Sequence, residues 1–439
     1  MIRLAASFTA AVLVAALTWL PAAAQIAIEN VNVLTMTDQE VREGWTVLVE
    51  GDRITAVGPA DDIEVPADAQ RIDGTGKFLI PGLAEMHGHI PPPGNSVQYV
   101  EDILFLFIAK GITTVRGMLG APGQLELRAR ANAGEIDSPT LYLSAPSFSG
   151  NSVDSPEHAV ELVRRYASEG WDYLKVHPGV NVDEYDAMAR TANEEGIPFI
   201  GHVPSSVGLR RAIEAGQQTV DHLDGYLEYM EAMDGPIDPV RLEEVVQLTL
   251  EHDVCVIPTM ALWETILGVN PEIELQAYEE LRYVPANMRE DWARIYRNRR
   301  SAADFDQVRV DQIAANRIEL LRALNEAGAC ILMGTDAPQQ YSVPGFSLYR
   351  EFPLMVAAGM SPYEILVSGT RTVGEYFADK DDFGTIEEGK RADLILLNRN
   401  PFENVMNALD NDGVMVRGRW YSAEDIEQRL EEIADRSSS

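Results

Sequence analysis

The chain has 439 residues and a formal net charge of −34, and 46% of its residues are hydrophobic. This length exceeds one minimal domain and suits a barrel of about 250 residues with a smaller domain beside it. The negative charge argues against binding to nucleic acid or to an anionic membrane surface, because the long-range field would repel both.

The first 24 residues have the pattern of a secretory signal peptide. Arg3 precedes an apolar run from Leu4 to Leu20, and Pro21 and three alanines follow. The run is shorter than the roughly 20 residues that span a bilayer, so we expect Sec-type export, cleavage after Ala24 and no membrane insertion afterwards. No cysteine stands at the expected cleavage site to carry a lipid. The sequence therefore predicts a periplasmic or secreted protein that is not a lipoprotein.

Two β-rich stretches lie at opposite ends of the mature chain. Neither has enough strands to bury a face alone, so we expect residues 25–80 and 384–425 to pair into one small β-sandwich. A helical or disordered tail should follow at 426–439. Alternation of apolar and polar residues predicts strands at 26–36, 45–49, 53–57, 392–397 and 413–420.

Residues 81–383 repeat one unit, an amphipathic helix followed by a glycine and a short apolar strand. Glycine just past a helix is typical of a helix end, and eight strands that alternate with helices imply an α/β fold closed into a (β/α)₈ TIM barrel. A helical insertion at about 264–317 could form a lid or a contact in a homo-oligomer. The expected barrel strands are 83–86, 112–115, 140–143, 173–176, 198–200, 219–220, 254–258 and 330–333.

The two cysteines, Cys255 and Cys330, fall within apolar, β-branched runs that indicate buried strands. An exported protein could oxidise them. A large core does not need a cross-link, however, so we expect two buried thiols.

Metal-ligating side chains end several of the expected barrel strands. His87 and His89 end the first strand two residues apart, so both imidazoles can reach one point. His202, His222 and Asp336 end the fifth, sixth and eighth strands. All five lie at the C-terminal rim, where barrel enzymes place their reacting groups. This pattern predicts a metal site at the barrel mouth.

Lys175 ends the fourth strand, in the run Tyr173-Leu174-Lys175-Val176-His177. An isolated lysine there would extend its amine to solvent. Beside four histidines and an aspartate, burial and adjacent cations should depress its pKa. A neutral amine can add carbon dioxide, and the resulting carbamate (N6-carboxylysine) would offer two oxygens to bridge two metal ions.

This order of ligands, with Pro81-Gly82 just before the first strand, resembles the amidohydrolase superfamily. The run from Gly384 to Leu394 belongs to the same resemblance, which covers nearly the whole mature chain. The run from Gly111 to Arg116 looks like the branch of prolidase-like and imidazolonepropionase-like hydrolases. The segment Ser144–Ser152 departs from prolidase-like members, because it lacks the glycine- and histidine-rich loop that helps hold the substrate carboxylate there.

The resemblance implies two divalent metal ions, with zinc as the default because imidazole and carboxylate ligands suit it. The implied ligands are His87, His89 and Asp336 for the more buried ion and His202 and His222 for the more exposed ion, with carboxylated Lys175 and a hydroxide between them. Asp336 would also move the proton from the hydroxide to the leaving group. The implied reaction is hydrolysis of an amide or peptide-like C–N bond in a small molecule such as a dipeptide or an N-acyl amino acid.

Three further residues are candidates for substrate contacts. Tyr226 lies four residues past His222 and could polarise the substrate carbonyl, or merely pack in the core. His177 lies two residues beyond Lys175 and could support the ligands. Arg116, at the end of the second strand, could bind an acidic group or form a structural ion pair.

Two other functions stay open at this point. A mononuclear deaminase or cyclic-amidine hydrolase could use the same barrel, although mononuclear members generally lack a bridging lysine such as Lys175. A barrel that has lost catalysis could serve as a binding scaffold, although such proteins usually lose ligands and all six are present here.

Overall fold

The computed structural model describes residues 25–92 and 94–438. The expected signal peptide at 1–24 lies outside these residues. Within the described residues, no helix combines the length and apolar character needed to cross a bilayer.

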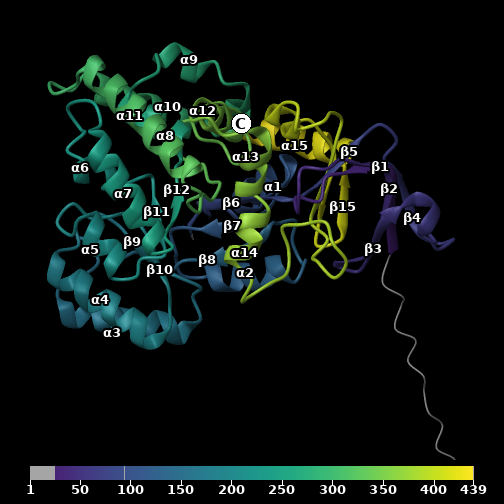
Figure 1. The fold of residues 1–439 in the computed structure, drawn as a ribbon, viewed down its shortest axis with the longest axis horizontal. Coiled ribbons are helices and arrows are strands. Elements are labelled where there is room, and N and C mark those ends of the chain that lie inside the picture. The colour runs from purple at the N-terminus through teal and green to yellow at the C-terminus, as the bar shows by residue number, and fades with distance from the viewer. Residues whose placement is uncertain (1–24, 93, 439) are drawn as a thin grey trace, which may run out of the picture.

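Both ends of the described chain contribute to one mixed sheet. Its strand order is β15-β14-β13-β5-β1-β2-β3, and β4 pairs with β1. The N-terminal and C-terminal parts meet where β5 pairs antiparallel with β13, as in the pair Ile80–Ile395. Figure 1 shows these purple and yellow segments side by side, away from α3 and α4. The strands are β1 (Gln25–Val33), β2 (Arg42–Glu50), β3 (Arg53–Pro59), β4 (Gln70–Asp73), β5 (Phe78–Pro81), β13 (Leu394–Leu397), β14 (Asn411–Val416) and β15 (Arg419–Ser422).

The central part has a TIM-barrel-like arrangement of short parallel strands. One sheet holds β6-β7-β8 and another holds β12-β11-β10-β9. A parallel bridge between Ser144 and Tyr173 joins β8 to β9. On the other side, Val256 bridges Ile331, and the Met86 N–H donates to the Met333 carbonyl at 2.9 Å. The strands are β6 (Leu83–Gly88), β7 (Ile112–Gly117), β8 (Thr140–Leu143), β9 (Leu174–Val176), β10 (Phe199–Gly201), β11 (Thr219–Asp221) and β12 (Cys255–Ile257).

Helices alternate with these strands, and their ends follow local sequence signals. In α4, Asn181 and Glu184 form a capping box, and Gly196 ends the helix in the left-handed conformation at φ 70°. The helices are α1 (Val97–Ala109), α2 (Gln124–Asn132), α3 (Pro156–Glu169), α4 (Val182–Glu195), α5 (Leu209–Glu214), α6 (Tyr226–Tyr229), α7 (Pro239–Glu251), α11 (Gln307–Glu326), α12 (Leu348–Ala357), α13 (Pro362–Ser368), α14 (Arg371–Tyr376) and α15 (Ala423–Ser437), with 3₁₀ turns η1 (Ala60–Asp62) and η3 (Val405–Leu409).

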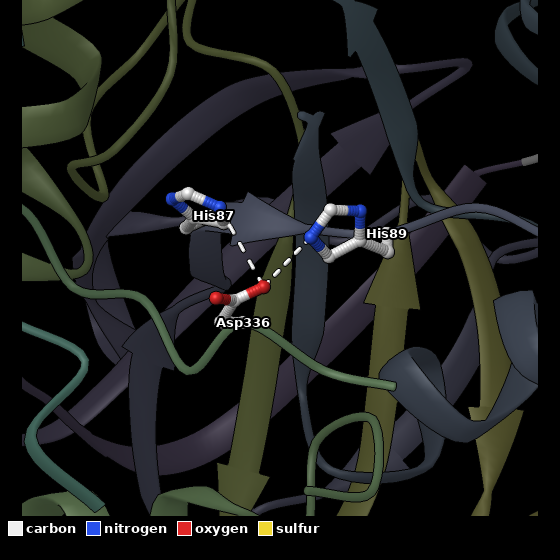
Figure 2. Close-up of side chains that lie close together, drawn as sticks. All are labelled: His87, His89 and Asp336. Atoms are coloured by element: carbon white, nitrogen blue, oxygen red, sulfur yellow. Dashed lines mark ion pairs between the residues drawn. The ribbon is translucent and has the colours of Figure 1, made fainter. Parts of the chain in front are cut away.

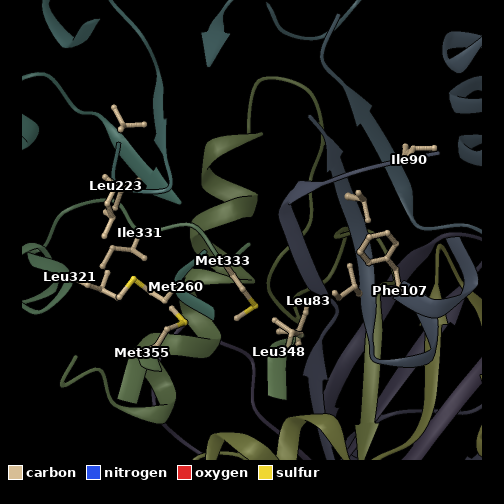
Figure 3. Close-up of a cluster of buried hydrophobic side chains, with 14 of the residues drawn as sticks. Leu83, Ile90, Phe107, Leu223, Met260, Leu321, Ile331, Met333, Leu348 and Met355 are labelled. Atoms are coloured by element: carbon tan, nitrogen blue, oxygen red, sulfur yellow. The ribbon is translucent and has the colours of Figure 1, made fainter. Parts of the chain in front are cut away.

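The insertion after β12 is helical, as the sequence predicts. It contains α8 (Met260–Leu267), α9 (Glu272–Gln276), the 3₁₀ turn η2 (Glu279–Tyr283) and α10 (Ala286–Arg300). It packs onto a continuous apolar core between the strands and the surrounding helices. Figure 3 shows part of this core, to which Met260, Met333 and Met355 contribute. This core holds in place the strand ends that carry the candidate metal ligands.

The expectation of two free thiols is wrong, because Cys255 and Cys330 form a disulfide. Cys255 begins β12, and Cys330 stands just before Ile331, which bridges Val256. The two Cα atoms are therefore 4.5 Å apart on neighbouring parallel segments, a separation within the range for a disulfide. Sequence spacing alone does not reveal this adjacency.

Candidate metal centre

The six side chains expected to bind metal come together at the carboxyl ends of the barrel strands. His87 lies on β6, Lys175 lies on β9, and His89, His202, His222 and Asp336 lie in segments that directly follow strands or strand-like runs. Strand alternation turns Lys175 and Asp221 toward the barrel interior, while their neighbours Val176 and Val220 pack against the outer helices.

The tightest group consists of His87, His89 and Asp336 (Figure 2). Their potential ligand atoms all lie within 4.8 Å of one another. The Asp336 Oδ1 atom is 2.7 Å from His89 Nε2 and 3.5 Å from His87 Nε2. The other carboxylate oxygen, Oδ2, is 3.6 Å from His222 Nε2. Asp336 therefore stands between the histidines of the first strand and those farther along the chain.

Lys175 joins the same group from the opposite side. Its side chain is fully buried, and its Nζ atom lies 3.5 Å from His87 Nε2 and 3.2 Å from Asp221 Oδ2. Gly201, at φ 120°, gives this side chain room, because a Cβ there would lie 2.8 Å from Lys175 Cδ. The imidazole rings continue the group, with centroids 4.4 Å apart for His87 and His222 and 4.6 Å apart for His222 and His202.

Each of three ring Nδ1 atoms faces an oxygen outside the group. His87 Nδ1 is 3.0 Å from Asp221 Oδ2, and His202 Nδ1 is 2.6 Å from Asp224 Oδ2. His222 Nδ1 and the Thr259 hydroxyl are 2.7 Å apart. This arrangement leaves Nε2 as the nitrogen free to bind a metal in each ring.

The backbone at the site is held in a conformation that non-glycine residues rarely adopt. His222 and Asp336 have φ values of 63° and 61°, and Thr259 has 41°. Such left-handed residues persist where the surrounding structure holds them, often at functional sites. Arg317 braces one of them by donating to the His222 carbonyl at 2.6 Å and to the Pro258 carbonyl at 3.0 Å.

Burial sets the protonation of the central groups. It lowers the pKa of His87 and His222 well below the usual value, and nearby cations lower it further. Burial also lowers the pKa of Lys175. Burial alone would raise the pKa of Asp221, but Lys175 and Arg116 hold it below its usual value. The imidazoles of His87 and His222 are therefore neutral, which is the form that binds metals.

Two of the three residues expected to contact substrate do not reach the barrel mouth. Arg116 is fully buried and donates to the Met86 carbonyl at 2.8 Å, and it lies 3.6 Å from Asp221. It forms the structural ion pair rather than a substrate contact. Tyr226 is also fully buried, and its hydroxyl is hydrogen-bonded to Thr249 on α7 at 2.8 Å. Of the two alternatives for Tyr226, the structure shows the one in which it packs in the core.

His177 does lie beside the group. Its ring centroid is 4.9 Å from that of His202, and its buried Nδ1 atom has no hydrogen-bond partner. Burial lowers its pKa to about 2. A neutral ring with an unused nitrogen at this position is available to a ligand of the site.

Sequence reasoning missed four polar residues that support the ligands: Asp221, Asp224, Thr259 and Glu85. The fully buried Glu85 carboxylate accepts the N–H groups of His87 at 3.0 Å and Thr335 at 2.8 Å, so it ties the first strand to the segment before Asp336. In a chain with 69 acidic residues, no composition signal separates these carboxylates from surface acids. For Asp221 and Asp224, proximity to His222 was the available signal.

The residues present fit a divalent metal. The buried Asp336 Oδ1 atom has no hydrogen-bond partner, and the histidines direct their Nε2 atoms toward it. Neutral imidazoles with a carboxylate are ligands typical of zinc and related ions. His87, His89 and Asp336 could hold one such ion.

Comparisons with known proteins show which family and which structures the chain resembles. The amidohydrolase family matches residues 78–421. Imidazolonepropionase from Idiomarina loihiensis is 24% identical over 84% of this chain and 90% of the relative. The structure of bottromycin amidohydrolase has a TM-score of 0.73 at 22% identity, over 94% of this chain and 90% of that one. A Xaa-Pro dipeptidase with bound methionine has a TM-score of 0.69 at 19% identity, over 91% and 100%.

The structural neighbours share the TIM-barrel-like fold with a second domain, and the family match spans most of the chain together with the histidine–aspartate cluster. The chain therefore belongs to the amidohydrolase family and is a hydrolase that acts on carbon–nitrogen bonds.

Proposed function

We propose that this protein is an exported amidohydrolase with two metal ions that cleaves an amide or peptide-like C–N bond. The observation that carries the proposal is the position of the buried Lys175 amine, 3.5 Å from His87 Nε2. A lysine at this point favours two ions, because mononuclear members of the superfamily generally lack it. The substrate we favour is a dipeptide, an N-acyl amino acid or a related small molecule.

Lys175 is suited to become N6-carboxylysine. Because burial lowers its pKa, a larger share of the amine is neutral. The neutral nitrogen adds to the carbon of CO₂, a new N–C bond forms, and one proton leaves to solvent. The product carries two oxygens in place of the ammonium charge. They would complete a site for two ions, with His87, His89 and Asp336 on one side and His202 and His222 on the other.

Two bound divalent ions would supply an activated water and polarise the substrate carbonyl. Asp336 is placed to take a proton from that water, since its buried Oδ1 atom has no hydrogen-bond partner within the protein. The same carboxyl group can then protonate the leaving nitrogen. The Oδ1 atom lies 2.7 Å from His89 Nε2, so the carboxylate stands beside the ligands of the more buried ion. Zinc is the ion we expect first.

Two features support the substrate class and the export. Relatives and structural neighbours include an imidazolonepropionase, a Xaa-Pro dipeptidase and an amidohydrolase, and each name denotes action on a C–N bond. The Cys255–Cys330 disulfide suits an oxidising compartment, which agrees with the signal-like pattern at 1–24.

Metal analysis with a substrate screen tests the proposal. We expect about two zinc ions per chain, and turnover on a panel of dipeptides, N-acyl amino acids and lactams. Lys175→Ala and Asp336→Asn should each abolish turnover, and Lys175→Ala should also lose metal. Lys77→Ala is a matched control, because Lys77 pairs with Asp412 in the terminal sheet.

One ion per chain would instead favour the mononuclear deaminase or cyclic-amidine hydrolase. A protein loaded with two ions that cleaves nothing on the panel would refute the proposed reaction. Full activity of both variants would refute the roles given to Lys175 and Asp336.

A further inference from the structure

The four residues Asp221-His222-Leu223-Asp224 lie at the junction of three strands. His222 faces the centre of the site, while the two aspartates turn to ligands that come from other strands. Asp221 faces His87 from β6, and Asp224 faces His202, which follows β10. One short segment therefore contacts ligands of both expected ions.

The turn that makes this possible is left-handed at two consecutive residues. His222 has φ 63° and Leu223 has φ 54°. Two non-glycine residues in this region cost free energy, on the order of 1 kcal/mol or more each, and persist only where surrounding contacts hold them. Here the Arg317 guanidinium donates to the His222 carbonyl at 2.6 Å. The reversal brings Asp224 back toward the site, within 2.6 Å of His202 Nδ1.

As groups that face an imidazole nitrogen, Asp221 and Asp224 differ chemically from Thr259. An ionised carboxylate can only accept hydrogen bonds, so a ring nitrogen that bonds to it must carry the proton. A threonine hydroxyl can donate or accept, so Thr259 does not select a tautomer for His222. Asp224, by contrast, requires the proton on His202 Nδ1 and leaves the Nε2 lone pair for a metal.

Asp221 acts on two groups at once. Its Oδ2 atom accepts from Lys175 Nζ at 3.2 Å and lies 3.0 Å from His87 Nδ1, an ion-pair distance without the geometry of a hydrogen bond, and its Oδ1 atom accepts from Thr219 at 2.9 Å. The side chain is fully buried, and Arg116 lies 3.6 Å from the same Oδ1 atom. One oxygen of the carboxylate is therefore held by Thr219 and Arg116, and the other faces the ligands.

We propose that Asp221 and Asp224 are positioning residues, each fixing the ring of a metal ligand on another strand: Asp221 for His87 and Asp224 for His202. Asp224 thereby raises the affinity for the more exposed ion, and Asp221 raises the affinity for the more buried ion. The inference rests on the binuclear site of the proposed function, and it predicts that the two ions can be weakened separately.

Zinc titration of the full mature chain against a competing chromophoric chelator tests the assignment. Wild type should bind two ions. Asp224→Asn keeps the shape but no longer demands a proton on Nδ1, so the affinity for one ion should fall about 10- to 100-fold while the other is retained. Asp221→Asn should weaken the remaining, tighter ion by a similar factor. Asp154→Asn is the matched control, since Asp154 lies 3.6 Å from Nδ1 of the surface residue His158.

The ring tautomer gives a second measurement that needs neither metal nor activity. The chain has seven histidines, so ¹⁵N-histidine labelling yields a countable set of ring signals, and His202→Gln assigns one of them. We expect His202 in metal-free wild type to carry its proton on Nδ1, and in Asp224→Asn to lose this preference.

An unchanged affinity for both ions in Asp224→Asn, or a His202 proton on Nε2 in wild type, would overturn the inference. Should Asp224→Asn fail to fold, the wild-type tautomer alone decides. A wild type that binds only one ion would contradict the proposed function instead, and the tautomer measurement would still judge the role of Asp224.

Discussion

Breaking the disulfide between Cys255 and Cys330 should lower the free energy of unfolding substantially. The bond joins residues 75 apart in sequence. The entropy of closing a loop of that length in the unfolded chain corresponds to about 4.5 kcal/mol at 25 °C. Strain in the folded state and residual structure in the unfolded chain reduce such values, so we expect a measured loss of about 2–4 kcal/mol. The reduced thiols occupy the same place in the core, so little packing is lost with the bond.

The measurement compares urea unfolding of oxidised protein with that of protein reduced while unfolded and then refolded in a phosphine reductant. The Cys255→Ala/Cys330→Ala double variant is the control, because the reductant should leave its midpoint unchanged. Thiol titration of the unfolded, unreduced chain should find no free thiol, since the sequence contains only these two cysteines. Two titratable thiols, or equal midpoints with and without reductant, would refute the reasoning.

Two substitutions test buried charges elsewhere. Arg116→Met should destabilise the fold by about 3–5 kcal/mol in urea unfolding, because it removes a buried partner of Asp221; a raised KM with unchanged stability would restore a substrate role for Arg116. Burial raises the pKa of Glu351 from 4.5 to about 7. The contribution of this carboxyl group to the free energy of unfolding is therefore fully present below pH 4.5 and is lost as pH rises through 7. Wild type should therefore lose about 3 kcal/mol relative to Glu351→Gln between pH 4 and pH 8, and parallel stability profiles would contradict this.

The candidate ligands were predictable because strand ends are local features. An apolar run of three to six residues followed by histidine or aspartate places a polar side chain at the rim, whatever the rest of the barrel does. The prediction of His87, Lys175 and Asp336 as ligands required no knowledge of distant contacts. It required only the rule that the ends of parallel strands converge. The alternation of helices and strands gave the TIM-barrel-like arrangement in the same way.

The supporting carboxylates were not predictable in the same way. Asp224 contacts His202 because His222 and Leu223 adopt left-handed backbone, and neither residue type favours that conformation in a sequence. Tertiary contacts, including the one from Arg317, impose it. In sequence, only its nearness to His222 distinguishes such a carboxylate from the many surface acids.

The missed disulfide and the alternatives left open for Arg116 and Tyr226 share a cause, which is that sequence does not say how deep a side chain lies or what stands beside it. Arg116 belongs to a strand that ends at the rim, yet its long side chain reaches the buried Asp221 and Thr219. Tyr226 follows His222 closely, but it begins α6 and turns its hydroxyl to Thr249 on α7. Cys255 and Cys330 are neighbours because Val256 pairs with Ile331 in the barrel, and the sequence alone does not show this pairing.

The pairing of β5 with β13 constrains how this chain can acquire its structure during synthesis. Pro81 is paired with Leu394, so the edge of β5 has no partner until almost the entire polypeptide has been made. Such long-range pairing forms slowly, and an unpaired strand edge invites association with other chains in the meantime. Truncation before β13 would leave that edge permanently open, and residues 394–397 are thus required for the sheet formed by residues 25–81 to reach its final form.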